Sequence, residues 1–325
     1  METIRKIRKP IEADMERYRV LFDSYLNHSD PLLSEVFKAI SARKGKMMRP
    51  MLTLLVAKML GGRIEENSLY TAATFEYFHT ASLVHDDIVD ESEERRGQKS
   101  VNCAYGNKVA VLVGDYLLAN ALQCAAEAGN LRLVSIVSKA AQYLASGEIL
   151  QLDTVGAQTI SEDVYFDIIK RKTAALFSAC AEAGAQSACA DEADVERMRL
   201  LGEYIGICFQ IRDDIFDYND DASIGKPTGN DMKEGKLTLP VIHAILKEDD
   251  AEMRELAMKV KKGDVDQAMV DRLVDFTKQK GGIEYADEVM RTYAANAKSL
   301  LDAYPPSEAK DSLLLYIDYA VSRNL

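Results

Sequence analysis

The sequence is poor in residues that interrupt helices or cross-link chains. It has no tryptophan, and its 325 residues include only seven prolines and five cysteines. No proline lies between residues 51 and 226. Because proline breaks helices, this gap permits an uninterrupted series of them. Runs of alternating β-branched residues joined by Asn-Gly turns are also missing, so strands have little support.

The cysteine pattern excludes two structural roles. The number of cysteines is odd, and none shows Cys-x-x-Cys spacing. We therefore expect neither a disulfide framework nor a zinc site, and a reducing cytoplasm fits best. Residues 1–19 are charged throughout and resemble no secretory signal. The longest apolar stretch, residues 109–126, is broken by Asp115, Asn120 and Gln123, so no transmembrane segment is expected.

Acidic residues outnumber basic ones. The chain has 52 Asp and Glu against 40 Lys and Arg, a net charge of -12. Nucleic acid is not expected as the main partner, because binding its phosphates requires a basic face. Small phosphates need only a local cluster of cations and are still candidate ligands.

Apolar residues recur at spacings of three and four, as in Leu52, Leu55, Val56 and Met59. This periodicity predicts an all-α protein of about a dozen helices. No repeat or low-complexity linker divides the chain, so residues 1–325 are predicted to form one domain. Breaks are expected at Gly61-Gly62, Arg96-Gly97, Gly129, Gly156, Gly184, Gly281 and Pro305-Pro306.

Charge density predicts which helices are buried. Segments 105–128 and 199–217 carry few charges and are expected to be buried on most faces. Segment 247–264 is dense in charge and is expected to form a solvated outer helix.

Two short acidic motifs of the form Asp-Asp-x-x-Asp lie in apolar helical segments. With 3.6 residues per turn, the first and last aspartates of each motif share one helix face. Carboxylates this close repel each other unless cations neutralise them, and magnesium bridges carboxylates to phosphates. One motif alone would fit a solvated acidic patch, but two copies favour metal binding. The predicted magnesium ligands are Asp86, Asp87, Asp90, Asp213, Asp214 and Asp217.

Cations near these motifs are candidates for holding phosphate. Arginine binds phosphate bidentately and lysine acts as a point charge. Each one alone would equally fit a surface charge, and the glycine-rich segment 225–236 fits a lid or a plain loop. The candidates are Lys46, Arg49, Arg95, Arg96, Lys170, Arg171, Lys172, Lys226 and Lys236.

His79 lies seven residues before Asp86, two turns along the same face, and is expected to point toward the same cavity. A histidine satisfied within the bundle would show the same spacing. Gln210 lies one turn before Asp213. Glu76 and His79 match the Glu-x-x-His pattern of di-iron bundles, which need two copies. Only one copy is present, so a di-iron site is not predicted.

These motifs, in this order, resemble the trans-isoprenyl diphosphate synthase family over roughly residues 40–322. Residues 79–97 resemble its first aspartate-rich region, residues 209–218 the second, and residues 225–240 the following lid segment. The first basic loop departs from the family's usual Gly-Gly-Lys, because this chain has Lys44-Gly45-Lys46.

The resemblance implies a helical bundle around a deep cavity, usually a homodimer, with three magnesium ions per active site. The implied enzyme joins isopentenyl diphosphate head to tail to an allylic diphosphate, and product release implies transient membrane contact. The allylic diphosphate or its metals would be contacted by Arg95, Lys172, Thr173, Gln210, Lys226 and Lys236. Isopentenyl diphosphate would be held by Lys46, Arg49, His79 and Arg96. The residues implied in catalysis are Asp86, Asp87, Asp90, Lys172, Asp213 and Lys226.

Product length depends on where the cavity ends. Ala81 and Ser82 lie about one turn deeper than Asp86, and large aromatics there would close the tunnel early, as in short-chain relatives. Tyr77 and Phe78 lie further down as a candidate wall. We therefore expect a long all-trans product near octaprenyl, made from farnesyl diphosphate, although ordinary helix packing would also explain the small residues.

Three alternatives stay open. A class I terpene cyclase would have one aspartate-rich motif and no use for a second diphosphate. A geranylgeranyl diphosphate synthase would make a shorter product by the same reaction. A regulatory subunit of a heteromeric synthase would tend to lack one of the two motifs.

Overall fold

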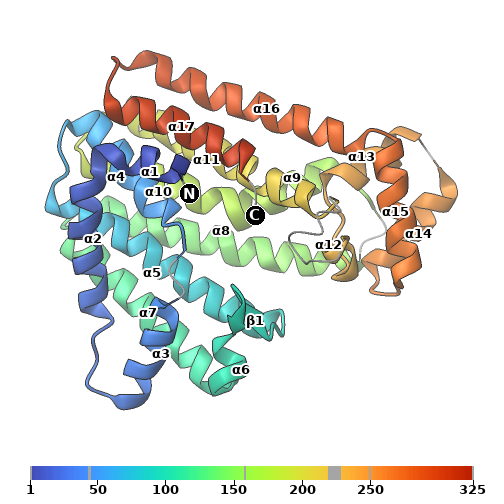
Figure 1. Ribbon diagram of the computed structural model, residues 1–325, viewed down its shortest axis with the longest axis horizontal. Helices are drawn as coiled ribbons and strands as arrows, with labels where there is room; N and C mark the ends of the chain where they lie inside the picture. Colours follow the sequence, from blue (N-terminus) through green and yellow to red (C-terminus); the bar gives the residue numbers. More distant parts are fainter. Residues whose placement is uncertain (1, 43–44, 157–158, 219–227, 249, 324–325) are drawn as a thin grey trace. The chain divides into compact units, whose positions relative to one another are not determined.

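The computed structural model describes residues 2–42, 45–156, 159–218, 228–248 and 250–323 (Figure 1). These ranges are almost entirely helical, which confirms the predicted fold class. They contain seventeen α-helices, more than the dozen expected, because several are short. The sheet found within them is a hairpin of two-residue antiparallel strands, β1 (Glu94–Arg95) and β2 (Gln98–Lys99). The Arg96-Gly97 break is thus a tight turn.

The chain forms two compact units. The first unit consists of residues 1–139, 179–199 and 304–316, and the second unit of residues 140–178, 200–303 and 317–325. Besides the hairpin, the elements wholly within the first unit are α1 (Glu2–Arg8), η1 (Lys9–Ile11), α2 (Glu12–Tyr25), α3 (Pro31–Ser41), α4 (Met48–Gly61), α5 (Glu66–Val89), α6 (Val101–Tyr105) and α7 (Asn107–Glu127).

The second unit contains mostly C-terminal helices. The elements wholly within it are α9 (Glu162–Ile169), the π-helical turn η2 (Lys170–Ala174), α12 (Asn230–Lys233), α13 (Leu239–Glu248), α14 (Ala251–Lys261), α15 (Gln267–Gln279), α16 (Gly282–Leu300) and η3 (Leu301–Ala303). Four helices contribute residues to both units: α8 (Leu131–Gly156), α10 (Ala175–Ser187), α11 (Glu192–Phe216) and α17 (Glu308–Ser322).

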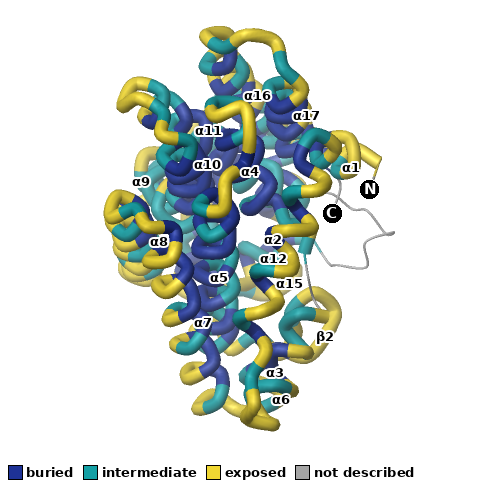
Figure 2. Tube along the Cα trace, turned by 90° about the vertical axis from the view of Figure 1, so that its left-hand side faces the viewer, coloured by how far each residue is buried: buried dark blue, intermediate teal, exposed yellow. Residues whose placement is uncertain are grey.

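Helix α5 forms the centre of the first unit. It packs against α2, α4, α6 and α7, and Figure 2 shows much of it as buried. Its buried residues include Ala72 and Ala73, whose small side chains let neighbouring helices approach closely. Tyr77 stacks on Phe22 of α2 with ring centroids 4.2 Å apart, and its hydroxyl donates to the Phe22 carbonyl. This packing fixes the helix that carries the first acidic motif.

The expectation that the segment now seen as α7 is buried on most faces is wrong. Val111, Leu112 and Leu122 expose 43%, 67% and 57% of their surface. The helix packs on α5 and α6 within the first unit, which covers only part of it. Among the helices that the structure describes, α7 is the one that is long and apolar enough to cross a membrane, but 44% of its most apolar stretch is buried inside the protein.

One predicted helix break is absent. Gly62, Gly129 and Gly281 do end or separate helices with positive φ, as expected. Gly184, however, lies inside α10, which continues to Ser187. A Cβ at Gly184 would lie 2.5 Å from the carbonyl oxygen of Thr53 in α4. The glycine therefore serves close helix packing rather than a turn.

The predicted outer helix over residues 247–264 is two elements. Helix α13 ends at Glu248, and α14 begins after Asp250, whose carboxylate accepts hydrogen bonds from two backbone N–H groups of its first turn. Side chains of Leu256, Ala257 and Val260 are buried, so α14 is amphipathic rather than fully solvated. They belong to the core of the second unit, together with Val241 and other residues of α12 to α15.

Candidate active site

The first acidic motif lies at the C-terminal end of α5. Asp87 is 2% exposed, and its Oδ1 accepts hydrogen bonds from Nε and a terminal nitrogen of Arg95 at 2.7 and 2.5 Å. Asp86 is half-buried and Asp90, which caps the helix, is exposed. The β1–β2 hairpin thus places a cation on the buried carboxylate. The sequence assigned Arg95 to the allylic diphosphate, and here Arg95 binds Asp87.

The backbone that follows the motif is fixed by further hydrogen bonds. The backbone N–H of Ser92 donates to the Asp87 carbonyl at 2.9 Å. The side-chain amide of Asn102 donates to the same carbonyl at 3.1 Å. Ser100 donates its hydroxyl to the Ser92 carbonyl at 2.6 Å. These contacts end α5 and hold the hairpin against it.

A small cavity of about 70 Å³ opens beside this pair within the first unit. Its lining includes Glu76, His79 and Asp87 of α5 together with Arg95 and Arg96 of the hairpin. Burial and the charges of Arg49, Arg96 and Arg95 hold the pKa of His79 well below its usual value, so this imidazole is neutral near pH 7. We call this space the basic cavity.

The basic loop before α4 contributes backbone to the same cavity. Gly45 and Met47 line it, and a Cβ at Gly45 would lie 2.8 Å from a terminal nitrogen of Arg96. The one glycine kept from the expected Gly-Gly-Lys pattern thus lets the guanidinium lie against the loop. Lys46 is exposed. Burial lowers the pKa of Arg49, which lies near enough to Glu76 for their charges to interact.

The second acidic motif lies at the C-terminal end of α11, in the second unit. Asp214 is 3% exposed and accepts hydrogen bonds from the Tyr165 hydroxyl at 2.5 Å and the Gln210 amide at 2.8 Å. Burial, helped by the charge of Asp231, raises the pKa of Asp214 well above its usual value. Asp213 instead pairs with Arg323 at 2.5 Å.

The third aspartate of this motif binds a helix N-terminus. Asp217 accepts the backbone N–H groups of Asn230 and Asp231 at 2.9 and 3.0 Å, at the start of α12. Burial raises its pKa despite these donors. Asp231 is a further acidic neighbour that the sequence reasoning missed, and burial and Asp217 raise its pKa to about 7. Its place in the glycine-rich segment 225–236, after the second motif, is the sequence signal for it.

Lys172 and Thr173 lie in the π-helical turn η2, and such turns are often found at functional sites. The Thr173 hydroxyl donates to Oε1 of Gln210 at 2.7 Å. Because Gln210 donates in turn to Asp214, the turn is linked to the motif by two hydrogen bonds. A Cβ at Gly206 would lie 2.5 Å from Cα of Ala174, so this glycine allows the close approach.

The other predicted cations differ in their contacts. Lys172 pairs with Glu148 at 2.8 Å and donates to the Gln151 amide oxygen at 3.0 Å. Arg171 pairs with Asp167, and Lys236 pairs with Glu234 at 2.6 Å. Lys226 falls outside the residues that the structure describes.

The predicted tunnel residues all lie on α5. Ala81 and Tyr77 have no exposed surface, and Ser82 and Phe78 are 8% and 5% exposed. Ser82 donates its hydroxyl to the His79 carbonyl at 2.9 Å. Their burial fits either a tunnel wall or ordinary helix packing.

The carboxylates offer oxygen donors, which suit a hard divalent cation such as magnesium. Within the described ranges, no group of three or more His, Cys, Asp or Glu side chains is gathered as a ready metal site. The reason is visible in each motif, because Asp87, Asp213 and Asp214 are turned toward protein partners. The donor chemistry fits a cation, and the contacts described above for Asp87 and Asp213 each use only the Oδ1 oxygen.

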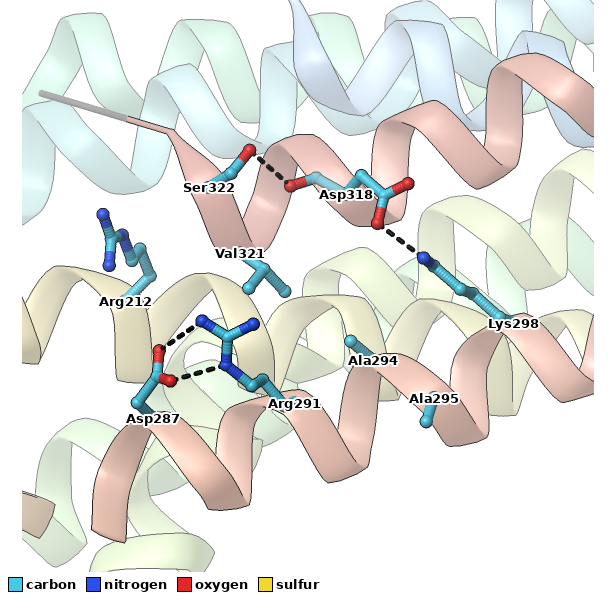
Figure 3. Close-up of a pocket in the computed structure, with 9 residues that line it drawn as sticks. All are labelled: Arg212, Asp287, Arg291, Ala294, Ala295, Lys298, Asp318, Val321 and Ser322. Carbon is cyan, nitrogen blue, oxygen red and sulfur yellow. Dashed lines mark hydrogen bonds and ion pairs between the residues drawn. The ribbon is translucent and has the colours of Figure 1, made fainter. Parts of the chain in front are cut away.

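A larger cavity of about 710 Å³ lies in the second unit and contains none of the predicted residues (Figure 3). Asp287 pairs there with Arg291, and Asp318 pairs with Lys298, both at 2.5 Å. Arg212 of α11 is the third cation in its lining. Cavity size alone would therefore not have identified the acidic motifs.

Comparison with known proteins gives a consistent result. The polyprenyl synthetase family model matches residues 30–277. The octaprenyl diphosphate synthase of Haemophilus influenzae is 35% identical over 324 residues, covering 99% of this chain and 98% of that protein.

Solved structures agree with this result. A geranylgeranyl pyrophosphate synthase from Bacteroides thetaiotaomicron has a TM-score of 0.87 and 47% identity, covering 99% of this chain and 100% of that one. A polyprenyl synthase from Caulobacter crescentus, complexed with calcium and isoprenyl diphosphate, has a TM-score of 0.90 and 33% identity, covering 98% of both chains.

Proposed function

The chain belongs to the polyprenyl synthetase family of trans-prenyl diphosphate synthases, and we propose that it extends farnesyl diphosphate with isopentenyl diphosphate to a long all-trans product near octaprenyl. The observation that carries the proposal is the basic cavity beside the first acidic motif, where Arg95 and Arg96 flank a buried aspartate. Arginine suits diphosphate because its planar fork binds two oxygens at once.

We assign the basic cavity to isopentenyl diphosphate, held by Lys46, Arg49, His79 and Arg96. Neutral His79 can donate one hydrogen bond without adding charge. The allylic diphosphate would be bound by Arg95, Lys172, Thr173, Gln210 and Lys236, with Lys226 as a further predicted ligand. Arg95 would then exchange Asp87 for phosphate oxygens when substrate and cations arrive.

Magnesium ions, three per active site, are proposed to bind the two aspartate trios. Calcium in the Caulobacter crescentus synthase complex supports a divalent cation. When bound, the ions stabilise negative charge that develops on the departing diphosphate. The residues implied in catalysis are Asp86, Asp87, Asp90, Lys172, Asp213 and Lys226.

In the reaction, the allylic carbon–oxygen bond breaks, and the isopentenyl double bond forms the new carbon–carbon bond. A proton is then lost to an oxygen of the released diphosphate. The lysine and arginine side chains hold the two diphosphates so that their reacting carbons lie next to each other. The hydrogen bond from Thr173 fixes the Gln210 amide so that its NH2 group faces Asp214. The apolar flanks of the two motif helices would keep water from the cationic intermediate.

Product length is proposed to depend on α5. Small side chains at Ala81 and Ser82 leave room for a growing chain, and Tyr77 and Phe78 form the later wall. Relatives named for both octaprenyl and geranylgeranyl products match this chain, so a direct assay is needed.

The deciding assay uses radiolabelled isopentenyl diphosphate, farnesyl diphosphate and magnesium, with chromatography of the products. We expect wild type to give octaprenyl-range products and Ala81→Phe to give products at least two units shorter. An unchanged length in Ala81→Phe would end the tunnel argument. A wild-type product of geranylgeranyl length would favour the short-chain alternative, and hydrocarbon released without isopentenyl diphosphate would favour a cyclase.

The protein is proposed to act in the cytoplasm as a homodimer. The apolar face of α7, where Leu112 is 67% exposed, would form the interface between the two subunits. Release of a long product would involve brief membrane contact. We expect Leu112→Asp to convert dimer to monomer in light scattering coupled to gel filtration, with Asp302→Asn, at an exposed residue outside α7, as the control. A wild-type monomer would contradict the proposal.

A further inference from the structure

Glu76 is an acidic residue inside the basic cavity. It lies on α5 one turn before His79 and lines the cavity together with His79 and Arg96. A carboxylate is unexpected in a space assigned to a diphosphate, because the two anions repel each other. The Glu-x-x-His pattern noted in the sequence therefore needs another explanation than a di-iron site.

Besides Arg96, the charged side chains that line the cavity with Glu76 are Asp87 and Arg95, which pair with each other. Within the described part of the chain its carboxylate forms no hydrogen bond and no ion pair, and the guanidinium groups of Arg49 and Arg96 act on it through space. Burial raises the pKa of Tyr18 on α2 well above its usual value and that of Cys180 on α10 to about 12, so both are neutral near pH 7.

Two opposing effects set the charge of Glu76 in the free protein. Burial raises the pKa of its carboxyl group, and Arg49 and Arg96 lower it. An incoming diphosphate would engage the same two guanidinium groups and add negative charge to the cavity. Both changes favour the protonated form of Glu76. The carboxylate that balances the arginines before binding is therefore the group that must be neutralised on binding.

We propose that Glu76 is the counter-charge of the basic cavity before substrate binds and takes up a proton from solvent when isopentenyl diphosphate binds. The inference rests on the proposed diphosphate role of this cavity. The protonated carboxyl group can donate a hydrogen bond to a phosphate oxygen, whereas the ionised one only accepts. Glu76 is thus a positioning residue, whose negative charge offsets those of Arg49 and Arg96 before the substrate arrives.

Calorimetric titration with isopentenyl diphosphate, without allylic substrate, tests the proton uptake directly. Titrations at one pH in buffers of different ionisation enthalpy give the number of protons bound. We expect wild type to take up as much as one proton more than Glu76→Gln. Any proton released by the diphosphate itself is common to both proteins and cancels in the difference. Equal proton numbers with intact binding would overturn the role of Glu76.

The pH dependence of affinity separates a titrating role from a structural one. As pH rises between the pKa of Glu76 in the free protein and that in the complex, wild type should lose affinity relative to Glu76→Gln, by as much as about tenfold per pH unit. Glu76→Asp keeps a titratable group and should keep the slope. A ratio of dissociation constants that stays constant with pH would mean that Glu76 only supports the structure.

Two controls identify which group and which site are involved. His79→Gln should keep the excess proton uptake, and if uptake disappears there but persists in Glu76→Gln, His79 is the acceptor and the inference is wrong. Arg96→Gln should weaken binding at least tenfold. If wild type does not bind isopentenyl diphosphate, or Arg96→Gln binds it normally, the assignment of the basic cavity fails and the inference fails with it.

Discussion

Asp87 in α5 and Asp214 in α11 occupy the same position in the same sequence pattern, but their surroundings differ. Asp87 is buried against the guanidinium of Arg95. Asp214 is buried against two neutral donors, the Tyr165 hydroxyl and the Gln210 amide, and its pKa is raised. One carboxylate is balanced by a charge, and for the other burial and the charge of Asp231 raise the pKa.

The difference shows that a motif does not fix the electrostatics of a site. A buried ion pair is strongly sensitive to loss of one partner, because the other charge is then left unpaired. A buried acid among neutral donors leaves no unpaired charge when its own charge is removed, so the cost is limited to the hydrogen bonds that a neutral replacement cannot accept. The two motifs are therefore expected to respond alike in catalysis and differently in stability.

The largest effect is expected on turnover, and here the motifs should behave alike. Asp87→Asn and Asp214→Asn should each lower kcat by about 10³ or more, corresponding to about 4 kcal/mol. Chelation with EDTA should abolish activity in wild type, and magnesium should restore it. Asp302→Asn, on the exposed surface, should leave kcat unchanged. A motif variant that keeps more than a tenth of the activity would show that its carboxylate is not needed for metal.

The next largest effect is expected on stability, measured as the free energy of unfolding in urea with EDTA present, and here the two motifs should differ. Asp87→Asn should lower the free energy of unfolding by about 1–3 kcal/mol, because the substitution removes the buried carboxylate that pairs with Arg95. Asp214→Asn should lower the free energy of unfolding by only about 1 kcal/mol, because asparagine can still accept the Tyr165 hydrogen bond and loses only the acceptor for the Gln210 amide. Equal losses in both variants would remove the distinction between a charged and a neutral environment.

A pH series measures the same contrast more finely. Folding raises the pKa of Asp214, so the folded state binds a proton more tightly than the unfolded state. The contribution of this carboxyl group to stability is complete below its unfolded pKa and is lost as pH rises toward its folded pKa. Wild type should therefore lose stability relative to Asp214→Asn over that window, by at most about 1.4 kcal/mol per pH unit. A difference that is flat with pH would show that Asp214 is already ionised in the fold.

The fold could be predicted because helical information is local. The spacing of Leu52, Leu55 and Val56 gives a buried face without knowledge of the partner helix, and glycine marks turns at Gly129 and Gly281. The predicted helix break at Gly184 was wrong because the role of this glycine depends on a distant part of the chain. Its purpose is the approach to Thr53, more than a hundred residues away, which no local pattern records.

The site was predicted unevenly for the same reason. Repeated aspartates predict the proposed metal ligands, since each motif lies within five residues. The partners of those ligands come from elsewhere in the chain. Tyr165 carries no motif, and Asp231 looked like part of a loop. Arg323, near the end of the chain, is likewise silent in the sequence, although it pairs with Asp213.

The smallest expected effect concerns that pair and sharpens the contrast within the second motif. Arg323 lies over the Phe209 ring at 3.6 Å, and its side chain is 8% exposed, whereas Asp213 is 37% exposed. Because Asp213 is partly solvated, Arg323→Met should cost only about 1 kcal/mol in urea unfolding. It should also remove a cation that competes with metal for Asp213, so the magnesium concentration for half-maximal activity should fall about threefold. Arg197→Met, which removes a cation that lies over the Tyr304 ring and pairs with Asp194 rather than with Asp213, is the matched control. If Arg323→Met needs more magnesium instead, Arg323 holds Asp213 in the orientation that binds the ion, and the second motif resembles the first in depending on an arginine.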